Sequence, residues 1–293
     1  MIKLFTDSTS YIPSDIQVEH NITVLPVTVV LNGKETYETA ISNDQFYAQI
    51  RKSGKPPKTK ALSPDEIAEA FEKEILDGNT VIGIFLSARA SETYKNAMTA
   101  KQKLMQKYPK ANITIVDTRS VGMKEGLAVL AAAEAIEKGS WLEDIVSAAE
   151  DSVHHTRFIF VPETLKYLEI SGRIGKARSL LASAFQITPI IAAQDGDAVP
   201  IEVIRVKSKA INRMLEMFEK DIKAYGVKNV VIQHIDCINE ALDMAQRAEE
   251  ISQVEVTICD IGAAMGANVG PGAIGIVYRT EEPMPDLESS VSM

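Results

Sequence analysis

Short runs of apolar, β-branched residues alternate along this chain with longer segments whose apolar positions recur every three or four residues. In the first half, the runs predict strands at residues 2–5, 23–30, 81–86 and 113–116. The segments that follow predict helices at residues 43–51, 64–76, 92–108 and 122–138. Strands that alternate with helices form βαβ units, so we expect a three-layer α/β/α arrangement around a parallel sheet.

Three helix starts carry the pattern of a capping box, in which a serine hydroxyl and a later carboxyl or amide group satisfy free backbone N–H groups. The pairs are Ser42 with Gln45, Ser63 with Glu66, and Ser140 with Glu143. Pro64 also suits the first position of its helix, because that position needs no N–H donor.

The second half predicts further strands after a helix that ends near residue 153. These strands are expected at 157–161, 186–192, 199–206, 229–235, 254–259 and 273–279. The turn Asp195-Gly196-Asp197 joins two of them without a helix, so the second sheet is predicted to be mixed. We therefore expect an N-terminal α/β domain over residues 1–153, a C-terminal α/β domain with a mixed sheet over 154–285, and a loose tail from Glu281.

Composition excludes several classes of function. Of 293 residues, 31 are Lys or Arg and 40 are Asp or Glu, and the net charge of −9 disfavours nucleic acid or an anionic membrane as a partner. Neither Cys237 nor Cys259 belongs to a CxxC pair and the four histidines lack metal-ligand spacing, so reduced thiols and no metal site are expected.

The sequence also predicts no integral membrane segment. The N-terminus reaches Asp7 too early for a secretory signal, which favours the cytoplasm. One uncharged run, residues 261–278, approaches the length of a membrane helix, but its glycines, Asn268 and Pro271 favour a Gly-rich loop that leads into a strand.

Small hydroxyl side chains gather directly after two predicted strands, at residues 6–10 and 87–93. Ligands of open parallel sheets bind beyond the carboxyl ends of the strands. Ser91 occupies an expected N-cap, where free amide donors could bind a small anion. The alternative is that Ser91 only caps its helix, while Ser8 and Ser10 make turn hydrogen bonds.

Two arginines have sequence contexts that suit an acidic ligand. Arg173 lies in a glycine-flanked turn and Arg205 ends a predicted strand. A guanidinium group binds a carboxylate through a planar fork and stays charged when it is desolvated. A surface ion pair is the alternative for each.

The Gly-rich segment 262–275 does not read as a dinucleotide site, although residues 270–275 match GxGxxG. Pro271 lies inside the match, and a strand follows it instead of a helix. Its glycines allow the backbone to approach a ligand or a neighbouring element closely.

There is no GxxxxGK[ST], HExxH or GxSxG. His234 and Asp236 end a strand and, paired with a serine, could form a hydrolase site, with an ordinary structural histidine as the alternative.

An ordered set of motifs along nearly the whole chain resembles the DegV family of bacterial fatty-acid-binding proteins. Residues 6–13 resemble its opening TDSTxDxP, and Ser87, Ser91, Thr93, Tyr94 and Ala97 match its SSxxSGTYxxA block. The other matches are 116–120 to VDS, 163–174 to TLxYLxxGGRI, 188–190 to KPI, and Gly270-Pro271-Gly272 to GPG.

This resemblance implies that one long-chain fatty acid lies between two domains, with its carboxyl group near the mouth of the pocket. It implies no cofactor and a carrier without catalytic residues. A separate fatty acid kinase, related to dihydroxyacetone kinases, would phosphorylate the bound carboxylate for phospholipid synthesis. Carried over by position, Ser91 and Thr59 would bind the carboxyl group, and Arg173 and Arg205 would serve the head group or the kinase. The other ligand-binding residues expected from the resemblance are Ser87, Thr93, Asn268 and Gly270.

Three features depart from the family pattern. The threonine loop usually reads TTSQPSP, whereas here it is Lys58-Thr59-Lys60-Ala61-Leu62-Ser63-Pro64. Asn268 stands where the family usually has histidine before VGPG, and asparagine cannot carry charge or move a proton. Glu92 replaces the glycine after Ser91. We therefore expect this protein either to bind fatty acid and to be a poor phosphotransfer substrate, or to prefer another ligand.

The apolar stretches 180–185 and 187–193 are expected to line the pocket, with ordinary core as the alternative. Two other functions remain open from the sequence. One is an enzyme, either a serine hydrolase or a dihydroxyacetone-kinase-like enzyme for small molecules, and the other is a regulatory protein that senses lipid.

Overall fold

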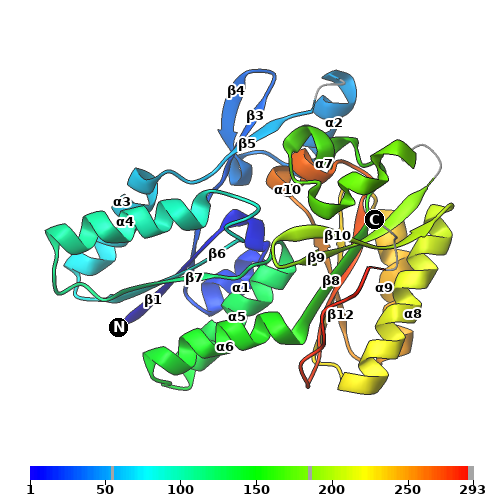
Figure 1. The fold of residues 1–293 in the computed structure, drawn as a ribbon. Helices are drawn as coiled ribbons and strands as arrows, with labels where there is room; N and C mark the ends of the chain where they lie inside the picture. Colours follow the sequence, from blue (N-terminus) through cyan, green and yellow to red (C-terminus); the bar gives the residue numbers. More distant parts are fainter. Residues whose placement is uncertain (54–55, 184–186, 290–293) are drawn as a thin grey trace.

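The N-terminal part of the chain is built on a parallel four-stranded sheet, as predicted. The computed structural model describes residues 1–53, 56–183 and 187–289. The strands are β1 (Ile2–Asp7), β2 (Ile22–Leu25), β6 (Thr80–Phe85) and β7 (Ile113–Asp117), in the order β2-β1-β6-β7. Helices cover both faces of this sheet (Figure 1), so the layers are α/β/α.

Alternation along the strands explains the two helical layers. Phe5 packs with α3 (Pro64–Leu76) and α4 (Thr93–Lys107) on one face, whereas Leu4 packs with α5 (Met123–Glu137) and α6 (Leu142–His155) on the other. Successive side chains of a strand point to opposite faces, so each strand supplies both cores. The short α1 (Ser14–Glu19) joins β1 to β2.

The single strand predicted at residues 23–30 is wrong, because it is two strands in two sheets. After β2 the chain passes through Pro26 and Val27 and then forms β3 (Thr28–Leu31). Proline has no N–H to donate to a sheet, and the N–H of Val27 binds the Ser8 hydroxyl instead. With β4 (Lys34–Tyr37) and β5 (Lys58–Lys60), β3 makes a small antiparallel sheet in the order β4-β3-β5.

The C-terminal part carries the predicted mixed sheet, in the order β10-β9-β8-β13-β11-β12. The strands are β8 (Thr156–Val161), β9 (Thr188–Gln194), β10 (Asp197–Ile204), β11 (Asn229–His234), β12 (Val256–Asp260) and β13 (Ile274–Arg279). β11 and β12 are parallel and the other pairs are antiparallel. Helices α8 (Lys207–Tyr225) and α9 (Ile238–Ser252) cover the outer face (Figure 1).

The predicted turn between β9 and β10 is confirmed. Gln194 pairs with Asp197, and Asp195 and Gly196 between them have φ values of 50° and 73°. Positive φ at both loop residues is the geometry of the tightest hairpins.

Of the three predicted capping boxes, the one at Ser63 and Glu66 is complete, with Pro64 at the start of α3. At Ser42 the hydroxyl accepts the Gln45 N–H at 3.4 Å. The box at Ser140 is wrong, because the N-cap of α6 is Trp141. The backbone N–H of Ser140 is instead bonded to the Ala135 carbonyl, which closes the end of the preceding helix.

Two loop predictions in the C-terminal part are wrong. The Gly-rich segment contains a short helix, α10 (Ala263–Val269), between Gly262 and Gly270, because its alanines favour helix and Gly270 takes the positive φ of 91° that ends it. The acidic tail is not loose up to residue 289. Its Met284 and Leu287 pack on the outer core, and Ser289 donates to the Pro200 carbonyl.

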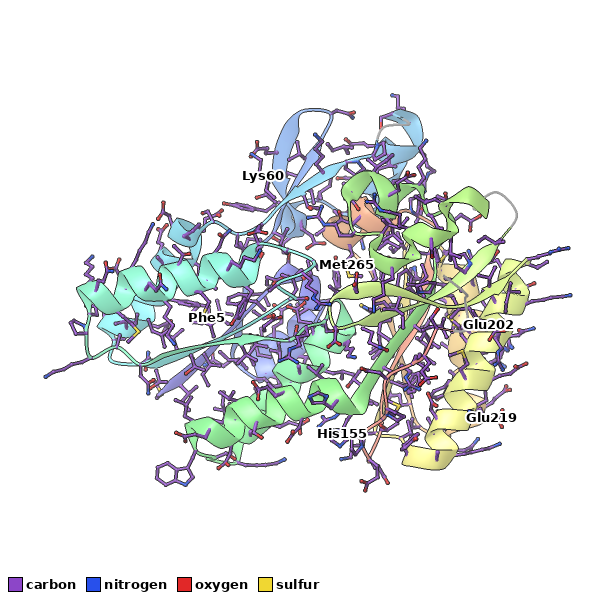
Figure 2. All side chains as sticks on the ribbon, in the orientation of Figure 1. Phe5, Lys60, His155, Glu202, Glu219 and Met265 are labelled. Atoms are coloured by element: carbon purple, nitrogen blue, oxygen red, sulfur yellow. The ribbon has the colours of Figure 1, made fainter. Side chains whose placement is uncertain are left out.

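A further apolar core lies between the two large sheets. It joins the inner face of the C-terminal sheet to the segment 27–50, which contains most of α2 (Asn43–Ser53), and to α7 (Lys166–Ser171) and α10. In Figure 2 the labelled Met265 of α10 lies centrally between the two halves, whereas Glu219 lies on the outer helix α8. The candidate site is in this layer.

Candidate functional site

A cavity of about 360 Å³ lies between the N-terminal strand ends and the inner face of the C-terminal sheet. Its volume is within the range of small-molecule sites, roughly 300–1,000 Å³. Apolar side chains from both halves line it, among them Val27, Leu86, Phe158, Phe160, Leu168, Ala193, Ile235, Ile261 and Ala264. Such a lining favours a ligand with a long apolar part.

Four of the predicted site residues line this cavity. Thr59 comes from β5, Ser91 from the loop before α4, Arg173 from the turn after α7, and Asn268 from α10. Thr59 and Ser91 are half-buried and Arg173 is exposed, so these groups form a polar rim around an apolar interior. The tertiary structure thus brings together residues more than 200 positions apart.

The rim residues are held by local hydrogen bonds. Ser91 does not occupy the N-cap of α4, since that position is Glu92, but its hydroxyl accepts the Thr93 N–H at 3.2 Å. The Arg173 guanidinium donates to the Ala90 carbonyl at 3.2 Å and to the Ser171 carbonyl. Arg173 therefore links the loop after β6 to the C-terminal part at the rim. Asn268 donates to the Ala264 carbonyl within its own helix.

The other four predicted site residues are not among the residues that line the cavity. Ser87 is buried beside it, where its hydroxyl accepts the Arg89 N–H. Thr93 is buried within α4, 3.1 Å from the Ser91 hydroxyl. Arg205 is exposed just after β10. Gly270 lies against the ring of Tyr167, where a Cβ atom would come within 2.4 Å.

The predicted apolar lining is represented in the cavity by Ala193, from the stretch 187–193. In the stretch 180–185, Leu180 is buried in the central core. Residues 184–185, like Gln186 at the start of a predicted strand, lie outside the described residues.

Sequence reasoning missed several polar lining residues. Arg89 and Lys60 lie at the rim, with Arg89 3.9 Å from Asp197. Ser120 and Gln233 line the interior. Arg89 lies in the hydroxyl-rich segment 87–93 and Ser120 in the motif at 116–120, so the sequence offered a signal for both. Nothing in the sequence distinguishes Gln233 from other strand residues.

A buried acid, Glu38, fixes the start of α10 beside the cavity. Its carboxylate accepts hydrogen bonds from the hydroxyl groups of Ser8 and Tyr11 and from the Ala264 N–H at 2.7 Å. Burial raises the pKa of Glu38 to about 7, against these hydrogen bonds, which favour its charged form. One carboxyl group therefore connects the loop after β1 to the helix that lines the cavity.

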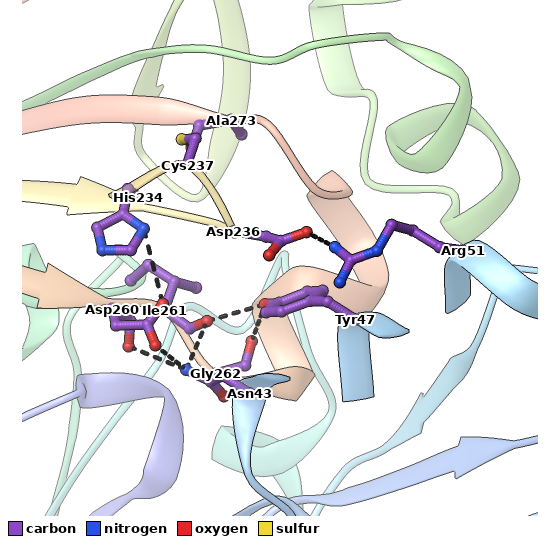
Figure 3. A network of polar contacts seen from close by, with 10 residues as sticks. All are labelled: Asn43, Tyr47, Arg51, His234, Asp236, Cys237, Asp260, Ile261, Gly262 and Ala273. Atoms are coloured by element: carbon purple, nitrogen blue, oxygen red, sulfur yellow. Dashed lines mark hydrogen bonds and ion pairs between the residues drawn. The ribbon is translucent and has the colours of Figure 1, made fainter. Parts of the chain in front are cut away.

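Helix α2 holds the other side of the loop before α10 (Figure 3). The Tyr47 hydroxyl donates to the carbonyl groups of Ile261 and Gly262 at 2.8 and 3.0 Å, and Asn43 donates to Asp260 at 2.8 Å. A Cβ atom at Gly266 would lie 2.1 Å from the Tyr47 hydroxyl. The predicted close approach by a glycine is therefore found here.

The arrangement around His234 differs from a hydrolase site. Its Nδ1 atom lies 3.7 Å from Asp260 (Figure 3), and Asp236 pairs with Arg51 instead. Neither ring nitrogen of His234 has a hydrogen-bond partner in the described ranges, so no serine there is hydrogen-bonded to it. Burial lowers the pKa of His234, and the Asp260 charge opposes this.

Two further searches of the structure bear on function. Among residues 1–53, 56–183 and 187–289, no three His, Cys, Asp or Glu side chains are grouped to hold a metal ion. Over the same ranges, every helix is too short or too polar to cross a bilayer. Cys237 and Cys259 are both free and half-buried.

Comparison with known proteins gives a consistent result. The model of the DegV family, described as an uncharacterised protein family, matches residues 1–281. A DegV domain-containing protein of Clostridium acetobutylicum is 35% identical over 283 residues, which are 97% of this chain and 99% of that protein.

Solved structures have the same fold. The crystal structure of DegV from Bacillus subtilis, a fatty acid binding protein, is 28% identical with a TM-score of 0.85, over 95% of this chain and 99% of that one. A stearic acid-binding protein from Eubacterium ventriosum is 24% identical with a TM-score of 0.88, over 96% and 99% of the two chains.

Proposed function

Because this chain belongs to the DegV family, we propose that it binds one long-chain fatty acid in the cavity between its N-terminal and C-terminal halves. The two halves act as domains, residues 1–153 and 154–285. The protein is a carrier and not an enzyme. It presents the carboxylate of the fatty acid to a separate kinase, which uses ATP in the cytoplasm to form an acyl phosphate for phospholipid synthesis.

The observation that carries this proposal is the division of the cavity into a mostly apolar interior and a rim of hydroxyl and guanidinium groups. A fatty acid has the same division. Burial of about 14 methylenes at ~0.8 kcal/mol each contributes about 11 kcal/mol, against an association cost of ~4–15 kcal/mol. A preformed pocket is therefore needed, and this fold provides one.

The roles of the rim residues follow from their chemistry. Thr59 and Ser91 donate hydrogen bonds to the carboxylate, and Arg173 supplies the opposite charge. Arg89 adds a second guanidinium at the rim. Arg205 lies on the exposed surface, so its role is in docking of the kinase.

A first experiment identifies the ligand and tests its head-group contacts. Organic extraction of the freshly purified protein is expected to release a long-chain fatty acid. In the delipidated protein, Ser91→Ala should weaken binding of stearate by about 10-fold or more, because a hydrogen bond to a charged group is lost. Titration calorimetry gives the affinities.

The matched control is Ser63→Ala, which removes a serine cap from α3 outside the cavity and should leave the affinity unchanged. The proposal would be contradicted if the purified protein contained no fatty acid and the delipidated protein did not bind stearate, palmitate or oleate.

The kinase step is tested at Asn268. Asn268→His should raise the rate of acyl phosphate formation by a fatty acid kinase by about 100-fold at unchanged fatty acid affinity, because histidine can transfer a proton near neutral pH. The rate is measured from acyl phosphate formed with ATP, and Asn239→His on exposed α9 is the control. A wild-type rate as fast as that of the Asn268→His variant would refute the assigned role.

A further inference from the structure

Two buried polar side chains on the interior wall of the cavity have no hydrogen-bond partner. The Oγ atom of Ser120 and both the nitrogen and the oxygen of the Gln233 amide are unpartnered among the described residues. Ser120 is 1% exposed and Gln233 is 2% exposed, and both line the cavity. A buried polar group without a partner is costly, so such groups mark a place where a ligand supplies the missing contact.

Strand register places Gln233 on the inner face of the C-terminal sheet, where it lines the cavity. A row across the inner sheet face runs from Phe160 through Gly275 to Gln233 and then to Cys259. Gly275 has no side chain that could bond the Gln233 amide, and a Cβ atom there would meet Phe160 at 2.7 Å and Phe158 at 2.9 Å. On the other side lies the Cys259 thiol, whose pKa is raised by burial while the neighbouring Gln233 side chain opposes this rise. A thiol is a weak hydrogen-bonding group, so it leaves most of the donors and acceptors of the amide unsatisfied.

Ser120 approaches the same region from the N-terminal half. It lies two residues before Gly122, where a Cβ atom would come within 2.9 Å of the Gln233 Oε1 atom. The backbone carbonyl of Ser120 accepts a hydrogen bond from the Ser87 N–H at 2.8 Å, and this bond fixes the backbone. The Ser120 hydroxyl has no partner among the described residues. The hydroxyl and the amide thus come from opposite sides of the junction between the two halves.

We propose that the cavity selects fatty acids that carry a hydroxyl group on the chain, and that Gln233 and Ser120 bind this hydroxyl. An amide and a hydroxyl each donate and accept, which matches an alcohol. Both groups are neutral, and a second carboxylate would be buried there without an opposite charge. This inference rests on the proposed fatty-acid function and specifies its substrate class.

The test compares ligands on one delipidated protein, so it needs no variant to fold. The probes are octadecanoic acid, octadecanedioic acid and hydroxyoctadecanoic acids with the hydroxyl at successive positions. At least one hydroxy acid should bind about 10-fold more tightly than octadecanoic acid. Gln233→Leu and Ser120→Ala should each remove this preference while octadecanoic acid still binds, and Gln246→Leu on exposed α9 should keep it.

Equal binding of octadecanoic acid and every hydroxy acid overturns the selectivity and leaves the carrier function standing. Tighter binding of the dicarboxylic acid than of any hydroxy acid also overturns it. If none of these acids binds, the proposed function itself fails, and the selectivity fails with it.

Discussion

Replacement of Ala193 by phenylalanine is expected to reduce the affinity for a long-chain fatty acid by about 100-fold or more. Ala193 lies on β9, belongs to the central core and lines the cavity. A phenyl ring in a cavity of about 360 Å³ leaves less room for the acyl chain. Exclusion of four methylenes at ~0.8 kcal/mol each costs about 3 kcal/mol, which corresponds to roughly 200-fold in affinity.

Ala193→Ser is the matched control, because it changes the same position with little change in volume. It should bind stearate within a few-fold of the wild type. Affinity is measured by titration of delipidated protein, and thermal unfolding of each variant without ligand shows whether the fold is kept. A folded Ala193→Phe variant with wild-type affinity would mean that the acyl chain lies elsewhere.

Replacement of Arg157 by methionine is expected to lower the free energy of unfolding by about 3–5 kcal/mol. Arg157 pairs with Asp221 of α8, and each residue is only 8% exposed. Tyr278 donates to the same carboxylate at 2.5 Å. Without the guanidinium, a buried carboxylate remains with no opposite charge, which costs far more than the loss of a surface pair.

Arg213→Met provides the contrast. Arg213 pairs with Glu202 and Glu216 on the surface, where its side chain is 42% exposed, so its loss should cost at most about 1 kcal/mol. The double variant Arg157→Met, Asp221→Leu should be more stable than Arg157→Met alone. Urea unfolding measures all three, and equal losses for the two single variants would argue against a special cost of the buried charge.

Much of the fold follows from local pattern. The helix predicted at residues 64–76 is α3 with the same bounds, because a proline, a capping box and a regular apolar face all agree there. Where local signals competed, the prediction failed. The sequence predicts Ser140 as the N-cap of α6, but its backbone N–H donates to the Ala135 carbonyl at the end of α5.

The sequence likewise identified one part of the candidate site and missed another. Thr59, Ser91, Arg173 and Asn268 were proposed from motifs and line one cavity. Arg205 was carried over from the family by position as well, yet it is exposed and is not among the residues that line the cavity. Gln233 carries no local signal, because a single polar residue in a strand gives no indication of which face will be covered.

The sequence by itself determined the alternation of strands and helices, the parallel and mixed sheets, the tight turn at Asp195 and Gly196, and the membership in a family. These depend on residues close together in the chain and on a pattern of motifs. Only the tertiary structure decided that residues 27–50 pack on the C-terminal sheet and that Ser120 and Gln233 line the cavity without a hydrogen-bond partner among the described residues. The physical reason is that a cavity is the space left between elements distant in sequence, and its size and polarity depend on their packing.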